Sequence, residues 1–284
     1  MNVGARTQTP ALVARDVPVP AAGEQPALGY SCHAVGVSLP GPQGSRKVLA
    51  GVDLEVAGGE VVSIVGRSGT GKTTLLRVLG GLLPADEGTV LLGEQAVSGP
   101  PASAVTVFQD YARALLPWRT VRRNVALGLE GRRACGRAER ERLVADALDA
   151  VGLGGRGDDR PWRLSGGMQQ RVQIARALAL RPRVLLMDEP FGALDAMTKA
   201  SLQDELLAVH ARTAPTIVFV THDVDEAVYL GDRVLILDGQ PGAITDEVPV
   251  SLPRPRDQLT TKEHPTFLSL RHRVHDAVGG AHGA

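Results

Sequence analysis

Apolar residues gather in short, uninterrupted runs along this chain, and glycine, proline or charged residues bound each run. The clearest runs are VVSIV (61–65), RVLLMDE (183–189) and TIVFVTH (216–222). Apolar runs without polar alternation, such as the β-branched VVSIV, are typical of strands buried on both faces of a parallel sheet. Runs of the same kind predict further strands at YSCHAVGVSL (30–39), VLAGVDLEV (48–56), TVLLG (89–93), AVTVFQ (104–109) and RVLILD (233–238).

Helical periodicity alternates with these runs. KTTLLRVLGGLL (72–83) predicts a helix that two glycines close. RAERERLVADALDAVGL (137–153) places its apolar residues on one face, and a last helix is predicted over 265–278. The order of elements predicts an α/β protein whose parallel-sheet core is interrupted by a mostly helical insert at about 110–165.

The loop GRSGTGKT (66–73) follows a predicted strand and opens a predicted helix. It fits the phosphate-binding pattern G-x-x-x-x-G-K-[ST], in which glycines let backbone N–H groups surround phosphate oxygens. Lys72 would reach the β- and γ-phosphates, and the Thr73 hydroxyl would ligate Mg²⁺. The predicted nucleotide-binding residues are Gly66, Arg67, Ser68, Gly69, Thr70, Gly71, Lys72, Thr73 and Thr74.

Two adjacent carboxylates end the strand at 183–189. Asp188 is predicted to bind Mg²⁺, and Glu189 to act as general base on the attacking water. His222 ends another apolar strand, where it can contact the γ-phosphate and orient that water. Gln109 ends a third strand, and its carbonyl oxygen can touch Mg²⁺ or the water. Taken alone, Gln109 also fits an ordinary polar loop residue.

LSGGMQQR (164–171) precedes a helical pattern. Ser165 is a good N-cap residue for a helix from about 167 to 180, with Gln170 near the capping-box position. The glycines leave the first N–H groups of that helix uncovered. The local pattern therefore fits either a well-capped helix or a second phosphate-binding device.

Together these motifs resemble ATP-binding-cassette (ABC) ATPase subunits, in order and approximate spacing, over about residues 30–240. The resemblance implies a P-loop NTPase fold with a RecA-like parallel-sheet core, an antiparallel β subdomain and a helical signature subdomain. It makes Gln109 the Q-loop residue, Asp195 of GALDA the D-loop aspartate and His222 the switch histidine. It also makes Leu164, Ser165, Gly166 and Gly167 the signature that completes the ATP site of a second subunit.

A finer resemblance is to the ATPase subunits of importers for nitrate, aliphatic sulfonates and taurine. LLPWRTVRRNV (115–125), FGALDAMTK (191–199) and LPRPRDQL (252–259) carry it. It implies that Leu115, Leu116, Pro117 and Trp118 help to dock a membrane permease, although these side chains also fit the interior of the helical insert. Leu39 stands where the family usually has an adenine-stacking aromatic.

Composition limits the kinds of binding partner that the chain can have. The 31 basic and 31 acidic residues balance, so no global charge draws the chain to nucleic acid. Two widely spaced cysteines favour a reduced, cytoplasmic protein, and no apolar run approaches the ~20 residues of a membrane span. We expect a disordered extension at 1–29, the ATPase domain at 30–245 and a C-terminal Pro/Arg segment with a helix at 246–284.

The expected protein is an ATP- and Mg²⁺-dependent homodimer on two permease subunits at the cytoplasmic face of a membrane. A periplasmic or lipid-anchored solute-binding protein would act indirectly, and no nucleic acid would be bound. The transported solute would be nitrate, an aliphatic sulfonate, taurine or a similar small molecule. The alternatives are a soluble ABC ATPase acting on nucleic acid or ribosomes, and an exporter ATPase.

Overall fold

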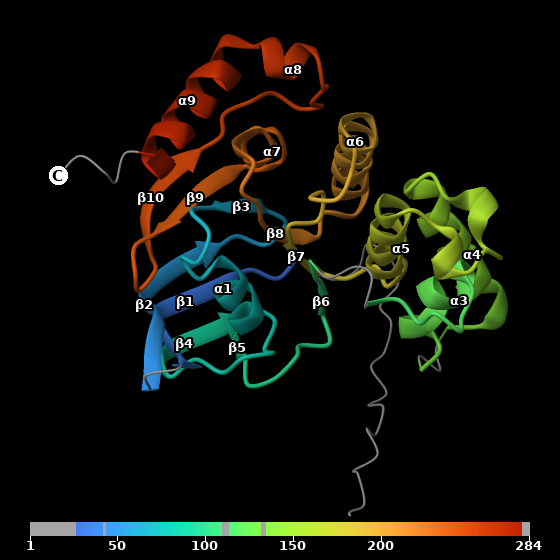
Figure 1. Cartoon of the computed structure of the whole chain (residues 1–284), viewed down its shortest axis with the longest axis horizontal. Coiled ribbons are helices and arrows are strands. Elements are labelled where there is room, and N and C mark those ends of the chain that lie inside the picture. Colours follow the sequence, from blue (N-terminus) through green and yellow to red (C-terminus); the bar gives the residue numbers. More distant parts are fainter. Residues whose placement is uncertain (1–26, 42–43, 110–113, 132–134, 280–284) are drawn as a thin grey trace, which may run out of the picture.

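The computed structural model describes residues 27–41, 44–109, 114–131 and 135–279. A six-stranded sheet forms the centre of the molecule, with a smaller sheet on one side and a group of helices at one end (Figure 1). Most of the predicted extension, residues 1–26, lies outside the described residues.

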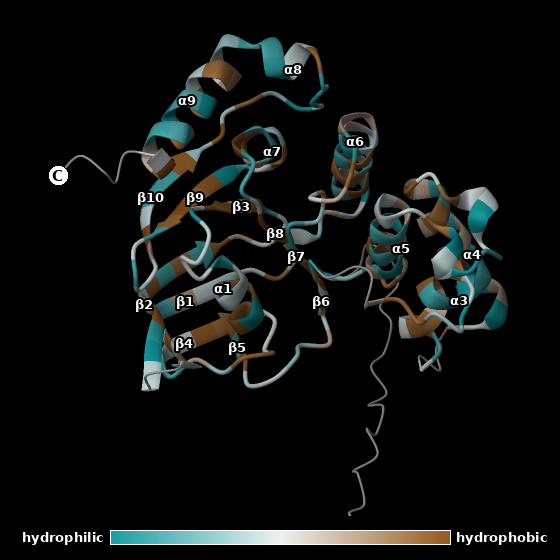
Figure 2. Ribbon diagram, viewed as in Figure 1, coloured by the Kyte–Doolittle hydropathy of each residue, from teal (hydrophilic) through white to brown (hydrophobic). Residues whose placement is uncertain are grey.

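The six-stranded sheet is parallel except at one edge. Its strands in spatial order are β10 (Ala243–Pro249), β9 (Arg233–Asp238), β3 (Val61–Val65), β8 (Thr216–Val220), β7 (Val184–Asp188) and β6 (Ala104–Val107). Every residue of β3, β7 and β8 is buried. This burial explains the uninterrupted apolar runs, and Figure 2 shows hydrophobic residues concentrated in this sheet.

The second sheet is antiparallel, as the resemblance implied, and it has four strands. They are β2 (Gly44–Val56), β1 (Tyr30–Gly41), β4 (Glu87–Leu92) and β5 (Gln95–Ala96). Helix α1 (Lys72–Leu79) shares one hydrophobic core with this sheet and one face of the large sheet. The predicted end of α1 is confirmed: Gly80 caps the helix and Gly81 has φ +64°.

The helical insert forms its own packed group. It holds α3 (Val121–Val125), α4 (Arg137–Ala150) and three 3₁₀ turns at Ala126–Leu129, Gly154–Arg156 and Pro161–Arg163. Helix α5 (Gly166–Ala179) packs against α3 and α4 and also reaches β6. The helical subdomain therefore continues past its predicted end at residue 165. The predicted apolar face of α4 is confirmed, since Leu143, Val144, Ala147 and Leu148 are buried.

The remaining helices are α6 (Ala196–Thr213), α7 (Val224–Leu230), α8 (Thr260–Glu263) and α9 (Pro265–Gly279). Helix α7 packs on β3, and α9 covers α7, β9 and β10 (Figure 1). In the Pro/Arg segment, the buried Arg256 donates to the carbonyl oxygens of Tyr229 (2.7 Å) and Gly231 (2.9 Å) at the end of α7. This segment therefore fastens the C-terminal helices to the core.

Two predicted boundaries are wrong. Residues 27–29 belong to the folded domain, because the carbonyl of Leu28 accepts from the Thr216 hydroxyl (2.6 Å) and that of Gly29 from Gly93 N–H. Strand β10 crosses the predicted boundary at 245/246 and extends the sheet beyond β9. Among the described residues, no helix combines the length and apolar character that crossing a bilayer requires.

Candidate nucleotide-binding and hydrolysis site

The phosphate loop lies between β3 and α1, as predicted. Gly71 has φ +100°, which favours glycine, and it precedes the first residue of α1. A Cβ on Gly66 would lie 2.0 Å from the carbonyl oxygen of Leu237, so the backbone passes β9 more closely than any side chain allows. The loop thus leaves its N–H groups and the helix start available to phosphate oxygens.

Lys72 folds its side chain back over this loop. Its Nζ donates to the carbonyl oxygens of Gly66 (2.7 Å) and Arg67 (2.8 Å), and the residue is buried. Burial lowers the pKa of Lys72, while the carboxylates of Glu189 and Asp188 oppose that shift. The two carboxylates compensate the charge of this ammonium group only in part, and a bound phosphate would supply the remaining negative charge.

Arg67 links the loop to the far end of the chain. Its Nε lies 3.3 Å from the carbonyl oxygen of Val278, and its Nη2 lies 3.3 Å from that of Gly279. A guanidinium group at the C-terminal end of α9 also complements the helix dipole there. The sequence motif predicted Arg67 only as a member of the phosphate loop.

Asp188 and Thr73 form a pair of hard oxygen donors beside the loop. The Thr73 hydroxyl donates to Asp188 Oδ1 at 3.1 Å, so strand β7 and helix α1 bring the two together. Burial raises the pKa of Asp188, and the hydrogen bond from Thr73 and the charge of Lys72 act against that shift. A hydroxyl, a carboxylate and phosphate oxygens suit Mg²⁺, which prefers oxygen ligands and keeps waters of its own.

Glu189 lies between the two other predicted catalytic side chains. Gln109 Nε2 donates to Glu189 Oε2 at 2.9 Å, and His222 Nδ1 lies 3.4 Å from Glu189 Oε1. Glu189 has φ +47°, a left-handed conformation that a non-glycine residue adopts at a cost. Three strand ends, β6, β7 and β8, thus bring these groups together at one edge of the sheet.

The signature segment opens α5, and Ser165 is its N-cap, as predicted. The Ser165 hydroxyl accepts from Met168 N–H at 3.3 Å. The predicted capping-box position of Gln170 is wrong. Gln170 is buried, where its amide donates to Glu189 O (3.3 Å) and accepts from Ala193 N–H (3.2 Å). Gln170 therefore connects α5 to the backbone of Glu189.

Asp195 is exposed and caps α6, because its side chain accepts from Thr198 N–H at 3.0 Å. One turn later, Lys199 pairs with Asp223 (2.6 Å) and Glu226 (2.5 Å) in the segment that follows His222. The sequence pattern FGALDAMTK contains Lys199 but predicted no role for it. Lys199 ties α6 to the start of α7.

The predicted docking residues differ in how far their side chains are buried. Leu115 is 3% exposed and packs in the helical core, so its assignment to a surface patch is wrong. Leu116 is half-buried, whereas Pro117 and Trp118 are exposed. Sequence reasoning missed Trp162, which is exposed like Trp118.

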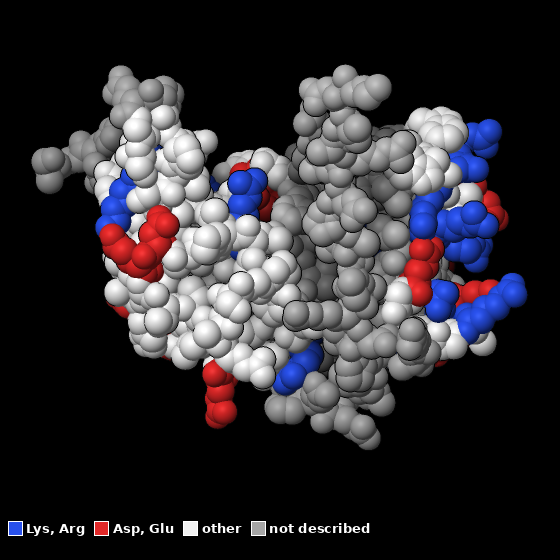
Figure 3. Space-filling view, turned by 90° about the horizontal axis from the view of Figure 1, so that it is seen from below, with Lys and Arg blue, Asp and Glu red and all other residues white. Residues whose placement is uncertain are grey.

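Arg160 brings the two tryptophans together. Its Nη1 donates to the carbonyl of Trp118, and its guanidinium carbon lies 5.7 Å from the centre of the Trp162 ring. The chain has only these two tryptophans, and both are exposed on one surface. We call Pro117, Trp118, Arg160 and Trp162 the tryptophan surface. Figure 3 shows Lys and Arg gathered at the helical end of the molecule.

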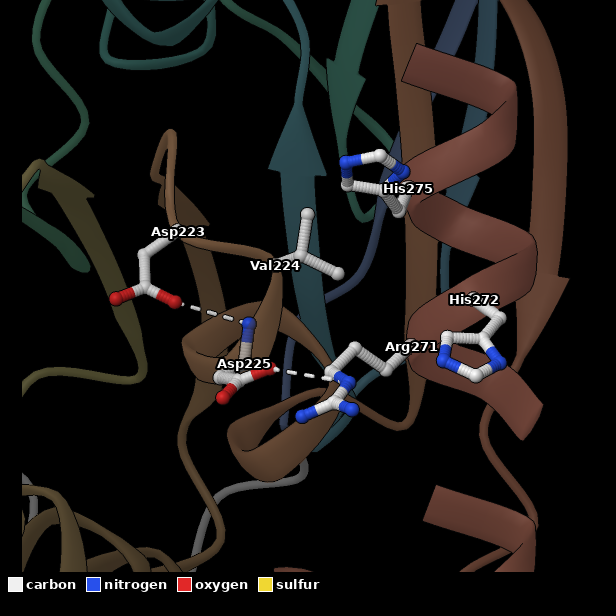
Figure 4. A pocket seen from close by; sticks show the side chains of 6 residues that line it. All are labelled: Asp223, Val224, Asp225, Arg271, His272 and His275. Carbon is white, nitrogen blue, oxygen red and sulfur yellow. Dashed lines mark hydrogen bonds and ion pairs between the residues drawn. The ribbon is translucent and has the colours of Figure 1, made fainter. Parts of the chain in front are cut away.

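A cavity of about 290 Å³ lies between α7 and α9. Figure 4 shows Arg271 extending from α9 toward Asp225 on α7, and the two side chains are 3.9 Å apart. Asp223, Val224, His272 and His275 complete its lining. The phosphate loop, Asp188 and Glu189 do not line this cavity. It is therefore a gap between the two helices and not the nucleotide site.

A phosphate loop, an Asp/Thr oxygen pair and a positioned carboxylate at the ends of parallel strands define a P-loop nucleoside triphosphatase. A profile of the ABC transporter family matches residues 49–192. The chain belongs to this family.

Known relatives and structures agree with this assignment. The chain is 47% identical to the bicarbonate transport ATP-binding protein CmpC of Synechocystis sp. over 81% of its length and 35% of that protein's. It is 44% identical to the nitrate import ATP-binding protein NrtC of Synechococcus elongatus, over 83% and 36%. The chain thus spans about a third of the length of these relatives.

A shorter relative is matched over most of its length. An uncharacterized ABC transporter ATP-binding protein of Methanocaldococcus jannaschii is 48% identical over 80% of this chain and 83% of its own. Among solved structures, a dimeric post-hydrolysis ATP-binding cassette bound to ADP and Pi superposes with a TM-score of 0.71 at 31% identity. That match covers 78% of this chain and 98% of the cassette.

Proposed function

We propose that this chain is the ATP-hydrolysing subunit of an ABC importer for a small solute such as nitrate, bicarbonate, an aliphatic sulfonate or taurine. The observation that carries the hydrolytic part is Glu189, which contacts Gln109 and His222 beside the phosphate loop. The names of CmpC and NrtC support a small anion as the solute.

The phosphate loop would hold the β- and γ-phosphates against the start of α1 and the ammonium group of Lys72. Glu189 would then accept a proton from the attacking water, while His222 and Gln109 orient that water and the carboxylate. Thr73 and Asp188 would hold Mg²⁺, with Gln109 at its edge; the ion neutralises charge that develops on the phosphates.

Subunit pairing follows from the separation of the phosphate loop and the signature. Figure 1 shows α1, which follows the phosphate loop, and α5, which follows the signature, on opposite sides of β6. A second copy would bring its Ser165 and the uncovered N-terminus of its α5 to the nucleotide. The solved cassette bound to ADP and Pi is described as dimeric, which supports the pairing of two copies.

The tryptophan surface is the proposed permease contact. Large aromatic side chains and arginine dominate the affinity of protein interfaces, and here both occur on the helical subdomain. We place the chain at the cytoplasmic face of a membrane, bound to two permease subunits. A similar solved structure, cbiO1 from Clostridium perfringens, is described as part of the ABC transporter complex cbiONQ.

The test of hydrolysis is Glu189→Gln. We expect ATP binding to persist and turnover to fall by about 10²–10⁴-fold, because the amide cannot accept the proton. Release of phosphate and equilibrium binding of ATP are measured on the same preparation. Glu263→Gln, which changes an exposed carboxylate on α8, is the matched control and should hydrolyse ATP normally. Full turnover in Glu189→Gln would remove Glu189 as the base.

A further inference from the structure

The β1–β2 hairpin passes beside the phosphate loop and continues beyond it. A Cβ on Gly71 would lie 2.7 Å from Leu49 Cδ2 and 3.2 Å from Val48 Cγ1, so β2 flanks the loop at these residues. Arg46 lies three residues further along β2, which is about 10 Å at the usual rise of a strand. A ligand whose phosphates occupy the loop therefore has its remaining parts within reach of the outer hairpin.

Arg46 and Leu39 occupy the face of the hairpin that looks toward the loop. Leu39 pairs directly with Arg46 across the two strands, and Val37 pairs with Leu49. Directly opposed residues share a face, and so do residues two apart on one strand. A register shift between the Val37 and Ser38 pairs leaves Val48 as an extra residue on β2, so Leu39 and Arg46 lie on the side of Leu49. A Cβ on Gly41 would lie 3.8 Å from Arg46 Cβ, which agrees with this orientation.

The neighbouring pair points the other way. Ser38 pairs with Lys47, and Lys47 Nζ bonds the Glu87 carboxylate on β4 at 2.8 Å. Arg46, in contrast, is exposed, and within the described parts of the chain its side chain has no hydrogen bond or ion pair. Leu39 is half-buried and, like Val48, packs against the core. The outer hairpin thus presents an apolar side chain and an uncommitted guanidinium group.

We propose that Arg46, paired with Leu39, binds the base of the nucleotide by stacking its guanidinium plane on the purine ring. This inference rests on the proposed function, because it requires the triphosphate to occupy the loop. Guanidinium groups stack on aromatic faces, which a lysine ammonium does not do in the same planar way. Tyr30, the one Phe, Tyr or Trp residue of the hairpin, is buried and donates to Leu79 O, so it cannot serve.

Stacking of this kind reads the face of a base rather than its edge. Every purine offers such a face, so the contact adds affinity without distinguishing adenine from guanine. We therefore expect the chain to bind ATP and GTP with similar affinity.

The experiment compares three ligands with Mg²⁺ on the full chain: ATP, GTP and inorganic tripolyphosphate, which has no base. Arg46→Ala should weaken ATP and GTP by about 2- to 30-fold, the range of a cation–π contact, and leave tripolyphosphate unchanged. Lys47→Ala is the matched control and should leave all three affinities unchanged. Leu39→Tyr combined with Arg46→Ala should restore nucleotide affinity, since the tyrosine ring can stack in place of the guanidinium group.

Unchanged ATP affinity in Arg46→Ala would overturn the inference while leaving the proposed function in place. So would an equal loss for ATP and tripolyphosphate, because Arg46 would then contact phosphate. A wild-type chain that binds none of the three ligands would overturn the proposed function and this inference with it.

Discussion

Single side chains join segments of this site that lie far apart in the sequence. Lys199 bonds Glu226, whose carboxylate is only 6% exposed, and Glu226 also accepts from the Thr221 hydroxyl. Burial raises the pKa of Glu226, and the bonds from Lys199 and Thr221 hold that rise back. Without Lys199, the buried carboxylate would have to carry its charge with one partner fewer.

Lys199→Met should therefore destabilise the fold by about 3 kcal/mol at neutral pH, the lower end for breaking a buried ion pair. The loss should shrink as the pH falls. A carboxyl group with a raised folded-state pKa binds its proton more tightly in the folded state, so protonation restores stability on the acid side. Denaturant unfolding of wild type and variant at several pH values measures the difference.

Lys47→Met is the control, because its partner Glu87 is exposed and an exposed pair contributes at most about 1 kcal/mol. A Lys199→Met deficit that stayed constant from neutral to acid pH would contradict the role given to Glu226.

Among the elements, the short segment before α3 is fixed by several hydrogen bonds from one buried side chain. Asn124 is fully buried, and its amide donates to the carbonyls of Leu116 (3.1 Å) and Thr120 (3.0 Å) while accepting from Leu116 N–H (2.7 Å). The backbone that carries Trp118 is thereby fixed before any partner binds. Such preorganisation lowers the entropic cost of association.

Replacing Trp118 with glutamate should abolish co-purification with the permease while ATP binding by the isolated chain persists. Truncation of a central aromatic anchor costs at least about 2 kcal/mol, or roughly 30-fold in affinity. Trp162→Glu should act in the same direction. Leu259→Glu, at an apolar residue that is 71% exposed beside α8, is the control. A normal complex in the Trp118 variant would exclude this surface as the docking site.

Local patterns predicted the elements well where burial is uniform. The sequence alone predicts β3, β7, β8 and the glycine loop before α1. Each of these is determined by residues that are adjacent in the chain. Strand β10 was missed, since an antiparallel edge strand is only partly buried and AITDEVP carries no strong alternation. The roles of Arg256, Trp162 and Arg46 depend on segments that meet only in the folded chain. No local pattern encodes such contacts.

At the scale of the whole molecule, the proposed scheme gives one copy the phosphate loop, Glu189 as the base and the Thr73 and Asp188 oxygens for Mg²⁺, and it assigns the signature to the site of a second copy. The uncovered start of α5, with Ser165 as its cap, has no phosphate of its own in the proposed scheme. A complete site then needs two copies arranged head to tail.

Ser165→Arg tests this arrangement. The bulky cation should block ATP-driven dimerisation, measured by light scattering with the Glu189→Gln background to prevent turnover. ATP affinity of the single chain should stay unchanged, because Ser165 contributes nothing to its own loop. Ser251→Arg, at an exposed residue after β10, should dimerise normally. Loss of ATP binding by the Ser165→Arg monomer would show that the signature acts within its own subunit.

The hydrogen bonds of Arg67 have a practical consequence. They attach the phosphate loop to the last turn of α9. A fluorophore placed at the exposed position of His275, one turn earlier on the same helix, is therefore mechanically connected to the loop proposed to hold the nucleotide. A dye there becomes a reporter of occupancy, and any label on this helix becomes an experimental variable in the affinities measured on this protein.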